Sequence, residues 1–150
     1  MLNDLYSERL LAAAGAIPPA RRLAAPHGSA RKTSRVCGSE VAVDLRLENG
    51  VVADFGLEAK ACALGQASAS MMARAIIGAA PAELFALRDA VRAMLKEGGP
   101  PPSGARWAEI EALMAIRDYP QRHASTLLVF EAVAAALEAA GCVEHAPARA

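Results

Sequence analysis

The sequence has no excess of charge of either sign, because 16 basic residues balance 16 acidic ones. This balance argues against general electrostatic attraction to nucleic acid or to an anionic membrane. It also lacks any apolar run of the roughly 18 residues that a membrane-spanning helix needs. Aromatic residues make up only 4%, and much of the 54% hydrophobic fraction is alanine, which favours helices in close contact. We therefore expect neither nucleic acid nor a membrane as a partner.

Cysteine is also scarce, with three residues in a chain of 150. An odd, small number argues against a disulfide framework and favours reduced thiols or metal ligands. The apolar stretch LLAAAGAI could pass for part of a signal peptide, but Asp4 and Glu8 precede it where a signal carries positive charge. We expect a cytoplasmic protein with one domain over residues 1–150, of which about 142–150 form a flexible tail.

A strictly alternating stretch, EVAVDLRLENGVVADFGLE, begins at Glu40. Alternation with a period of two predicts a strand with one buried and one solvated face. The residues expected on the buried face are Val41, Val43, Leu45 and Leu47, and those expected on the solvated face are Glu40, Asp44, Arg46 and Glu48. The pattern thus predicts a half-buried strand followed by a hairpin.

The Asn-Gly pair in this stretch marks the turn of the hairpin. A two-residue loop would place Leu45 opposite Asp54 and mix buried with solvated side chains. A three-residue loop over residues 48–50 instead pairs Leu45 with Ala53 and keeps the apolar residues on one face. We therefore predict the three-residue loop. Continued to the open end, this register makes Cys37 and Cys62 neighbours, within roughly 5 to 8 Å.

The remainder of the chain predicts helices separated by short connections. A connector follows the first predicted helix and runs to about residue 30. A second connection, the EGGPPPSG linker, is too short to separate domains. Pro81 begins a helix with an apolar stripe, and Ser103 is a candidate cap for a short helix that carries Trp107. The other predicted helices cover about 3–14, 63–77 before Gly78, and 121–140 before Gly141. On the last of these helices, His123 shares a face with apolar residues and is expected to point inward.

The segment VCGSEVAVDLRLENGVVADFGLEAKACALGQASASMM, residues 36–72, resembles the core of the U-type iron-sulfur cluster assembly scaffolds. This family includes NifU N-terminal domains, IscU and SufU. The resemblance covers about residues 30–78 closely, and YPQRHASTLLVFEAV resembles the family's C-terminal helix more loosely. It implies an α+β fold, with a small antiparallel β-sheet and helices packed on one face.

The resemblance assigns thiolate ligand roles to Cys37 and Cys62, because soft sulfur suits an iron-sulfur cluster, here of the 2Fe–2S type, or zinc. Two family features are missing. The aspartate after Cys-Gly is Ser39, and the third cysteine is Ala124 or Ser125, depending on which form of the family motif is aligned. Neither residue can replace a thiolate.

With the alignment that places the third cysteine at Ala124, His123 matches a family histidine that directly precedes this cysteine and lies beside the site, which makes it a candidate third metal ligand with one coordination position left open. The alternative is a hydrogen-bonded core residue, the commoner role of a lone histidine on a helix face. Cys142 lies about 19 residues beyond His123, near 28 Å of helix, and is expected to be a tail thiol.

The function implied by the resemblance is that of a scaffold or sulfur acceptor, not of an enzyme. Its partners would be a cysteine desulfurase and cluster-recipient proteins, and it would act as a monomer or homodimer. Two alternatives follow from the missing ligands. One is a degenerate family member that binds no metal and serves as an interaction or regulatory module. The other is a thiol redox protein that cycles a Cys37–Cys62 disulfide.

Overall fold

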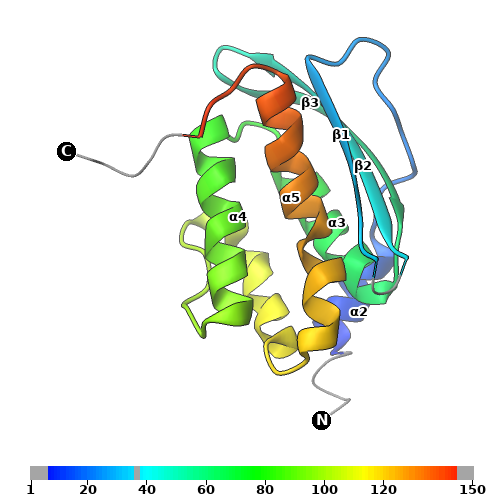
Figure 1. The fold of residues 1–150 in the computed structure, drawn as a ribbon, viewed down its shortest axis with the longest axis vertical. Helices are drawn as coiled ribbons and strands as arrows, with labels where there is room; N and C mark the ends of the chain where they lie inside the picture. The colour runs from blue at the N-terminus through cyan, green and yellow to red at the C-terminus, as the bar shows by residue number, and fades with distance from the viewer. Residues whose placement is uncertain (1–6, 36–37, 145–150) are drawn as a thin grey trace, which may run out of the picture.

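The computed structural model describes residues 7–35 and 38–144. Three antiparallel strands form one sheet in the order β1-β2-β3, with helices on one face (Figure 1). The strands are β1 (Gly28–Thr33), β2 (Glu40–Glu48) and β3 (Val51–Lys60). The helical elements are α2 (Glu8–Gly15), α3 (Ala63–Ala75), α4 (Pro81–Lys96), η1 (Ala105–Ile116), η2 (Pro120–Arg122) and α5 (His123–Ala139). The α+β class and the one-sided packing of helices are therefore confirmed.

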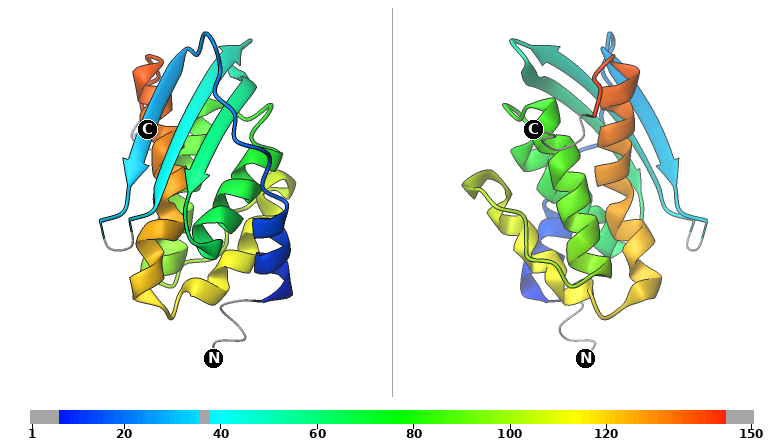
Figure 2. Two further views of the ribbon diagram at one scale, coloured as in Figure 1. Left: turned by 90° about the vertical axis from the view of Figure 1, so that its right-hand side faces the viewer. Right: turned by 60° about the vertical axis from the view of Figure 1, so that its left-hand side comes forward.

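Helix α5 is the centre of the helical layer. It packs against β1 and β2 on one side and against α3 and α4 on the other, while α3 also contacts α2 and β3 (Figures 1 and 2). Most of its length is consequently buried, which explains why its sequence is apolar nearly all round. Trp107 from η1 is buried in the same core. Among the helices that the structure describes, none has the length and apolarity required to cross a bilayer.

The hairpin register predicted from the sequence is wrong. Asn49 and Gly50 form a two-residue turn, both with positive φ (55° and 79°), the conformation that Asn-Gly favours. Leu47 then faces Val52, and the register shifts between Arg46 and Leu47. Ala53 is the extra residue on β3, and this bulge pairs Leu45 with Phe55 instead of Asp54. A bulge thus keeps the apolar residues on one face without a longer loop.

Strand β1 was not predicted, since the sequence suggested an irregular connector to about residue 30. Its residues, GSARKT, carry the polar side chains of an edge strand and give no apolar alternation over their whole length. Gly28 lies against the backbone of α5 at Ala136, where a Cβ atom would clash. Close approach of a helix, invisible in the local sequence, is what fixes this strand.

The prediction that Asp44 faces solvent is also wrong, because its side chain is 1% exposed. The connector between α2 and β1 runs beside β3 and then across the outer face of the sheet (Figure 2). It passes over Gly56, the residue paired with Asp44, where a Cβ would lie only 2.8 Å from the carbonyl oxygen of Arg21. Arg22 of this connector reaches the Asp44 carboxylate. The outer face is therefore covered at its centre.

The helix boundaries differ from the predictions in detail. Helix α3 ends at Ala75, and η1 has 3-10 geometry and begins after Gly104 instead of being capped by Ser103. Ser7 caps α2 by accepting a hydrogen bond from the N–H of Leu10, and the predicted start near residue 3 lies outside the described residues. Gly141, with φ of 93°, follows the end of α5, as expected.

Candidate functional site

Cys62 lies at a junction of three elements. It follows β3 directly and is the N-cap residue of α3, with a half-buried, free thiol that makes no capping hydrogen bond. Residue Glu40 at the start of β2 pairs with Lys60 at the end of β3, so the start of β2 lies beside this junction. The start of α5 lies at the same end of the molecule (Figure 1). Residues far apart in the sequence therefore meet around Cys62.

Cys37 lies outside the described residues, so its predicted proximity to Cys62 remains a prediction. The residues on either side of it are fixed by two backbone hydrogen bonds, from Gly38 N–H to the Ser34 carbonyl and from Ser34 N–H to the Ser39 carbonyl, both 2.8 Å. With the offset of the observed ladder, Gly38 would stand opposite Cys62. The corrected register thus places Gly38, the residue that follows Cys37 in the sequence, toward the end of the hairpin where Cys62 lies.

Ser125 supplies the contact that ties α5 to Cys62. The two side chains form a hydrogen bond in which the Cys62 Sγ donates to the Ser125 Oγ at 3.6 Å. The Ser125 hydroxyl donates in turn to the carbonyl of Arg122 at 3.2 Å, and the residue is 2% exposed. Ala124, the other position considered for the missing cysteine, is exposed. The structure therefore brings Ser125 to the candidate site.

Small residues allow α3 and α5 to approach each other closely at this point. A Cβ atom on Gly65 would lie 2.8 Å from the Cβ of Ala61 and 3.3 Å from the carbonyl oxygen of Ser125. Both distances are shorter than ordinary van der Waals contacts. Gly65, in the stretch of Ala, Ser and Gly after Cys62, thus lets the backbone of α5 at Ser125 lie close to the start of α3.

His123 is buried at 5% exposure, as its face on the helix predicted. Its Nε2 lies 3.0 Å from the carbonyl oxygens of both Ile116 and Arg117. Carbonyl oxygens only accept hydrogen bonds, so Nε2 must carry the proton. These contacts match the alternative of a hydrogen-bonded core residue. A metal could reach only the other nitrogen, Nδ1.

The structure also describes two further residues considered for the site, Ser39 and Cys142. Ser39, which stands where the family has an aspartate, is 3% exposed at the start of β2. Cys142 is partly buried beyond the C-terminal end of α5 and packs against the core. It is about 17 residues, near 25 Å of helix, from Ser125. Within residues 7–35 and 38–144, no group of three His, Cys, Asp or Glu side chains is close enough together to hold a metal ion. Cys37 lies outside these residues.

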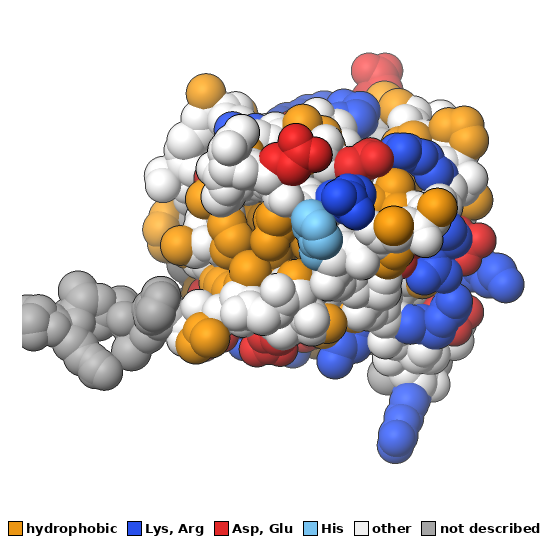
Figure 3. All heavy atoms as spheres, turned by 90° about the horizontal axis from the view of Figure 1, so that it is seen from above, with side chains coloured by type: hydrophobic (Ala, Val, Ile, Leu, Met, Phe, Trp, Pro, Cys, Tyr) orange, Lys and Arg blue, Asp and Glu red, His pale blue; other side chains and the backbone are white. Residues whose placement is uncertain are grey.

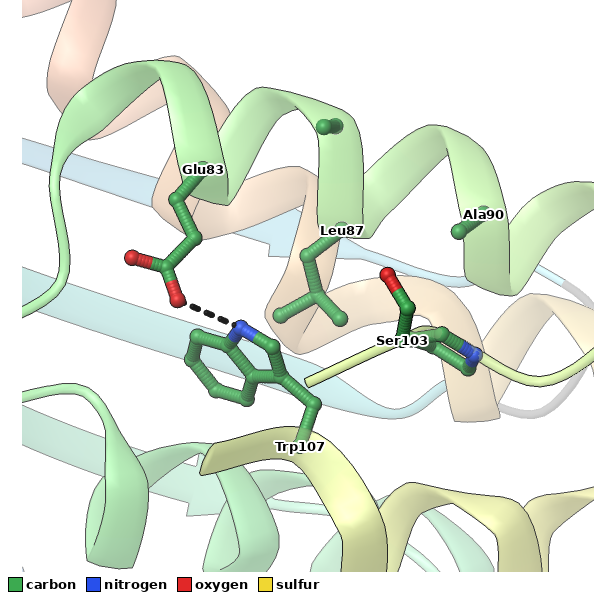
Figure 4. A pocket seen from close by; sticks show the side chains of 7 residues that line it. Glu83, Leu87, Ala90, Ser103 and Trp107 are labelled. Atoms are coloured by element: carbon green, nitrogen blue, oxygen red, sulfur yellow. Dashed lines mark hydrogen bonds between the residues drawn. The ribbon is translucent and has the colours of Figure 1, made fainter. Parts of the chain in front are cut away.

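A cavity of about 190 Å³ lies between α4 and η1 (Figure 4). Leu87, Ala90 and Ser103 line it, and the Trp107 indole Nε1 donates to the Glu83 carboxylate at 2.8 Å across it. This hydrogen bond joins η1 to α4.

The end of the molecule opposite Cys62 carries interspersed acidic and basic side chains around a hollow with apolar side chains (Figure 3). This mixture of charges is in keeping with the balanced composition.

The chain is similar to a known family and to known proteins. The family described as NifU-like N terminal domain matches residues 13–126. The iron-sulfur cluster assembly scaffold protein IscU of Thermotoga maritima is 31% identical over 102 residues, which cover 68% of this chain and 70% of that protein. The protein of the same description from Streptococcus pyogenes serotype M1 is 27% identical over 109 residues, covering 73% of this chain and 68% of that protein.

Solved structures agree with this result. The crystal structure of a nitrogen-fixing NifU-like protein (N-terminal) from Brucella abortus superposes with a TM-score of 0.90 at 49% identity, covering 93% of this chain and 96% of that one. The structure named as a putative iron-sulfur cluster assembly scaffold protein for the SUF system, from Fervidobacterium islandicum, shares the fold with a TM-score of 0.81 at 22% identity. The match covers 90% of this chain and 98% of that one.

Proposed function

This chain belongs to the family of NifU-like N-terminal domains, which are assembly scaffolds and not enzymes, and we propose that it holds an iron-sulfur cluster or zinc through Cys37 and Cys62. The observation that carries the proposal is the placement of Cys62. It is a half-buried free thiol at the N-cap of α3, beside the first turn of α5 and the start of β2. The metal or cluster is the cargo of such a scaffold, to be assembled and passed on.

The surroundings of Cys62 suit a soft, anionic cargo. Thiolates prefer iron, zinc and iron-sulfur clusters over hard cations. The N-terminal end of α3 carries a partial positive charge, which stabilises negative charge at its cap position. Half-burial leaves the sulfur accessible while the framework around it stays fixed. We further propose a cysteine desulfurase as the sulfur source, cluster-recipient proteins as acceptors, and a reducing cytoplasmic setting.

His123 enters this proposal as the third ligand through Nδ1. Metal-binding histidines commonly donate their other ring N–H to a carbonyl, which fixes the ring, and Nε2 has this arrangement with Ile116 and Arg117. A second candidate function is an interaction module that binds no metal. Ser125 favours that candidate, because a hydroxyl beside Cys62 stands where a further thiolate would complete a site.

The metal and acid-labile sulfide content of protein purified without oxygen tests the proposal. We expect bound metal in the wild type and its loss in Cys37→Ser and Cys62→Ser, because each substitution removes one soft ligand. Cys142→Ser is the matched control, since that thiol lies at the other end of α5 and should not affect metal content. Equal metal content in all four proteins, or none in the wild type, would contradict the proposed cargo site.

The role of His123 is tested with His123→Gln and His123→Ala. The glutamine amide can still donate to the two carbonyls but offers no nitrogen ligand at the position of Nδ1. If His123 is a ligand, both variants lose metal to a similar extent. If it serves only the core, His123→Gln keeps the metal-to-protein ratio, and His123→Ala lowers the melting temperature without changing that ratio in the folded fraction.

A further inference from the structure

The cavity between α4 and η1 is separate from the elements that meet at Cys62. One wall is a face of α4 that includes Glu83, Leu87 and Ala90, and the other is formed by Trp107 of η1 with Ser103 of the preceding linker. No residue that lines the cavity belongs to β2, β3, α3 or α5. A ligand in this cavity would therefore bind apart from the proposed cargo site.

The sequence of α4 explains why this space is open. Glu83, Ala86, Leu87 and Ala90 are spaced so that they lie on one face of the helix. Two of these four residues are alanines, whose methyl groups do not reach across to η1. Figure 4 shows Leu87 pointing from α4 toward the Trp107 ring, whereas the Ala90 side chain ends close to its own helix. The space beside Leu87 is therefore left unfilled.

Hydrogen bonds fix the wall opposite α4. Arg106, at the start of η1, donates from Nη1 to the carbonyls of Ala75 at 3.0 Å and Ile77 at 2.7 Å. At the other end of η1, Arg117 donates from Nη2 to the carbonyl of Gly99 in the linker, at 2.8 Å. A cavity whose walls are fixed before a ligand arrives needs little ordering when it binds.

The charges around the cavity favour an uncharged ligand. Among the described residues that line it, Glu83 is the only ionisable one. Its carboxylate accepts the hydrogen bond from Trp107 Nε1 and lies 3.3 Å from Arg106 Nε. This guanidinium balances the negative charge, so a charged ligand would find no unpaired partner in the lining.

One polar group in the lining is available to a ligand. The Ser103 hydroxyl makes no hydrogen bond to another residue in the part of the chain that the structure describes. It points toward α4 between Leu87 and Ala90 (Figure 4). A hydroxyl can both donate and accept a hydrogen bond. A ligand with an apolar body and one such polar group would match this lining.

We infer that the cavity binds a neutral small molecule with one aromatic ring and a hydroxyl group, with the ring against Leu87 and Trp107 and the hydroxyl hydrogen-bonded to Ser103. An apolar cavity of about 150 Å³ is large enough for benzene. The volume of about 190 Å³ therefore suits one ring with a small substituent.

The surroundings of the cavity favour a free small molecule over a side chain of a partner protein. Among the described residues, the large apolar side chains that are exposed are Leu11, Ile77 and Val143, and none of them lines the cavity. A protein-docking surface is expected to continue as an apolar patch beyond a single slot.

Titration of the full-length, ¹⁵N-labelled protein with phenol tests the inference. The chain has one tryptophan, so its indole N–H gives a single NMR signal from the wall of the cavity. We expect this signal to shift saturably, with a dissociation constant on the order of 1 mM for a ligand of this size. Ala90→Leu should weaken binding at least about tenfold, because its side chain fills the space beside Leu87. Ala82→Leu is the matched control at an exposed position of α4 outside the cavity, and should leave binding unchanged.

Ser103→Ala tests the hydrogen bond separately. It should weaken phenol binding about 2- to 10-fold, the usual contribution of one hydrogen bond. Binding of benzene, which has no hydroxyl, should be unchanged. Because Ser103 is exposed, this variant should fold like the wild type whatever the stability of Ala90→Leu.

Three results would overturn the inference. The first is no saturable shift with either phenol or benzene at about tenfold above the expected dissociation constant. The second is equal phenol affinity of the wild type and folded Ala90→Leu. The third is a Ser103→Ala variant that binds phenol as the wild type does, or that weakens phenol and benzene equally. None of these measurements involves metal, so their outcome is independent of the proposed function.

Discussion

Replacing Asp44 by asparagine should destabilise the protein substantially at neutral pH. The carboxylate accepts hydrogen bonds from Arg22 Nε at 2.7 Å and Nη2 at 2.9 Å, from Leu23 N–H at 2.9 Å and from Ser29 Oγ at 2.5 Å. Its side chain is 1% exposed, whereas that of Arg22 is 42% exposed. Asparagine keeps the shape and one acceptor oxygen but removes the charge.

The size of the expected loss in stability follows from the difference in exposure between Asp44 and Arg22. Breaking a fully buried ion pair costs about 3–5 kcal/mol, because the remaining charge is left buried without a partner. Arg22 can turn toward water, so we expect a smaller loss of about 2–4 kcal/mol in the free energy of unfolding. For a chain of this size, that corresponds to a fall of about 5–12 °C in melting temperature. Urea unfolding at pH 7, followed by the fluorescence of the single Trp107, measures it.

The effect should also depend on pH. The Arg22 guanidinium, helped by Ser29 and the Leu23 N–H, holds the pKa of the Asp44 carboxyl well below its usual range. A carboxyl with a depressed pKa in the folded state stabilises the fold above its unfolded pKa of about 3.9, and this contribution is lost as the pH falls toward the folded pKa. The difference between wild type and Asp44→Asn should therefore be complete above about pH 5 and shrink at pH 3.

Asp54→Asn is the matched control. Asp54 pairs with the neighbouring arginine of the same connector, Arg21, but its side chain is 40% exposed and the pair is open to solvent. We expect a much smaller change in stability than for Asp44→Asn. Equal effects of the two substitutions, or a difference from wild type that is the same at pH 3 and pH 7, would refute the reasoning from burial.

Two further predictions concern glycines at close contacts. Gly65→Ala should displace Cys62 and lower metal content in anaerobically purified protein, and adding Ala61→Gly should restore it, because the Ala61 methyl is the nearest obstacle at 2.8 Å. If Ala61→Gly does not restore the metal content, the effect of Gly65→Ala does not arise from its contact with the Ala61 methyl. Gly28→Ala should cost about 3 kcal/mol or more in urea unfolding, because its Cβ would enter the backbone of α5. The control Gly15→Ala, with no atom within 4 Å of the added Cβ, should be neutral or slightly stabilising.

The sequence by itself determined the features that depend on residues close together in the chain. The alternation after Glu40 predicts a strand, and Asn49-Gly50 predicts its turn. Pro81 and Gly141 mark helix boundaries that the structure confirms. The linked cysteine and Ala/Ser motifs identified the family, and the residue types suggested the site. Such signals are readable because backbone preferences and burial periodicity act over one or two turns of chain.

Only the tertiary structure decided which distant residues meet. The bulge at Ala53, and with it the hairpin register, depends on which face of the sheet the helices cover. Asp44 is buried because a connector some 20 residues earlier folds across it. Two alignments left the position of the missing family cysteine at Ala124 or Ser125, and the packing of α5 on α3 brings Ser125 to Cys62. These outcomes depend on contacts between segments separated by tens of residues, whose free energy arises only when the whole core assembles, so no local pattern encodes them.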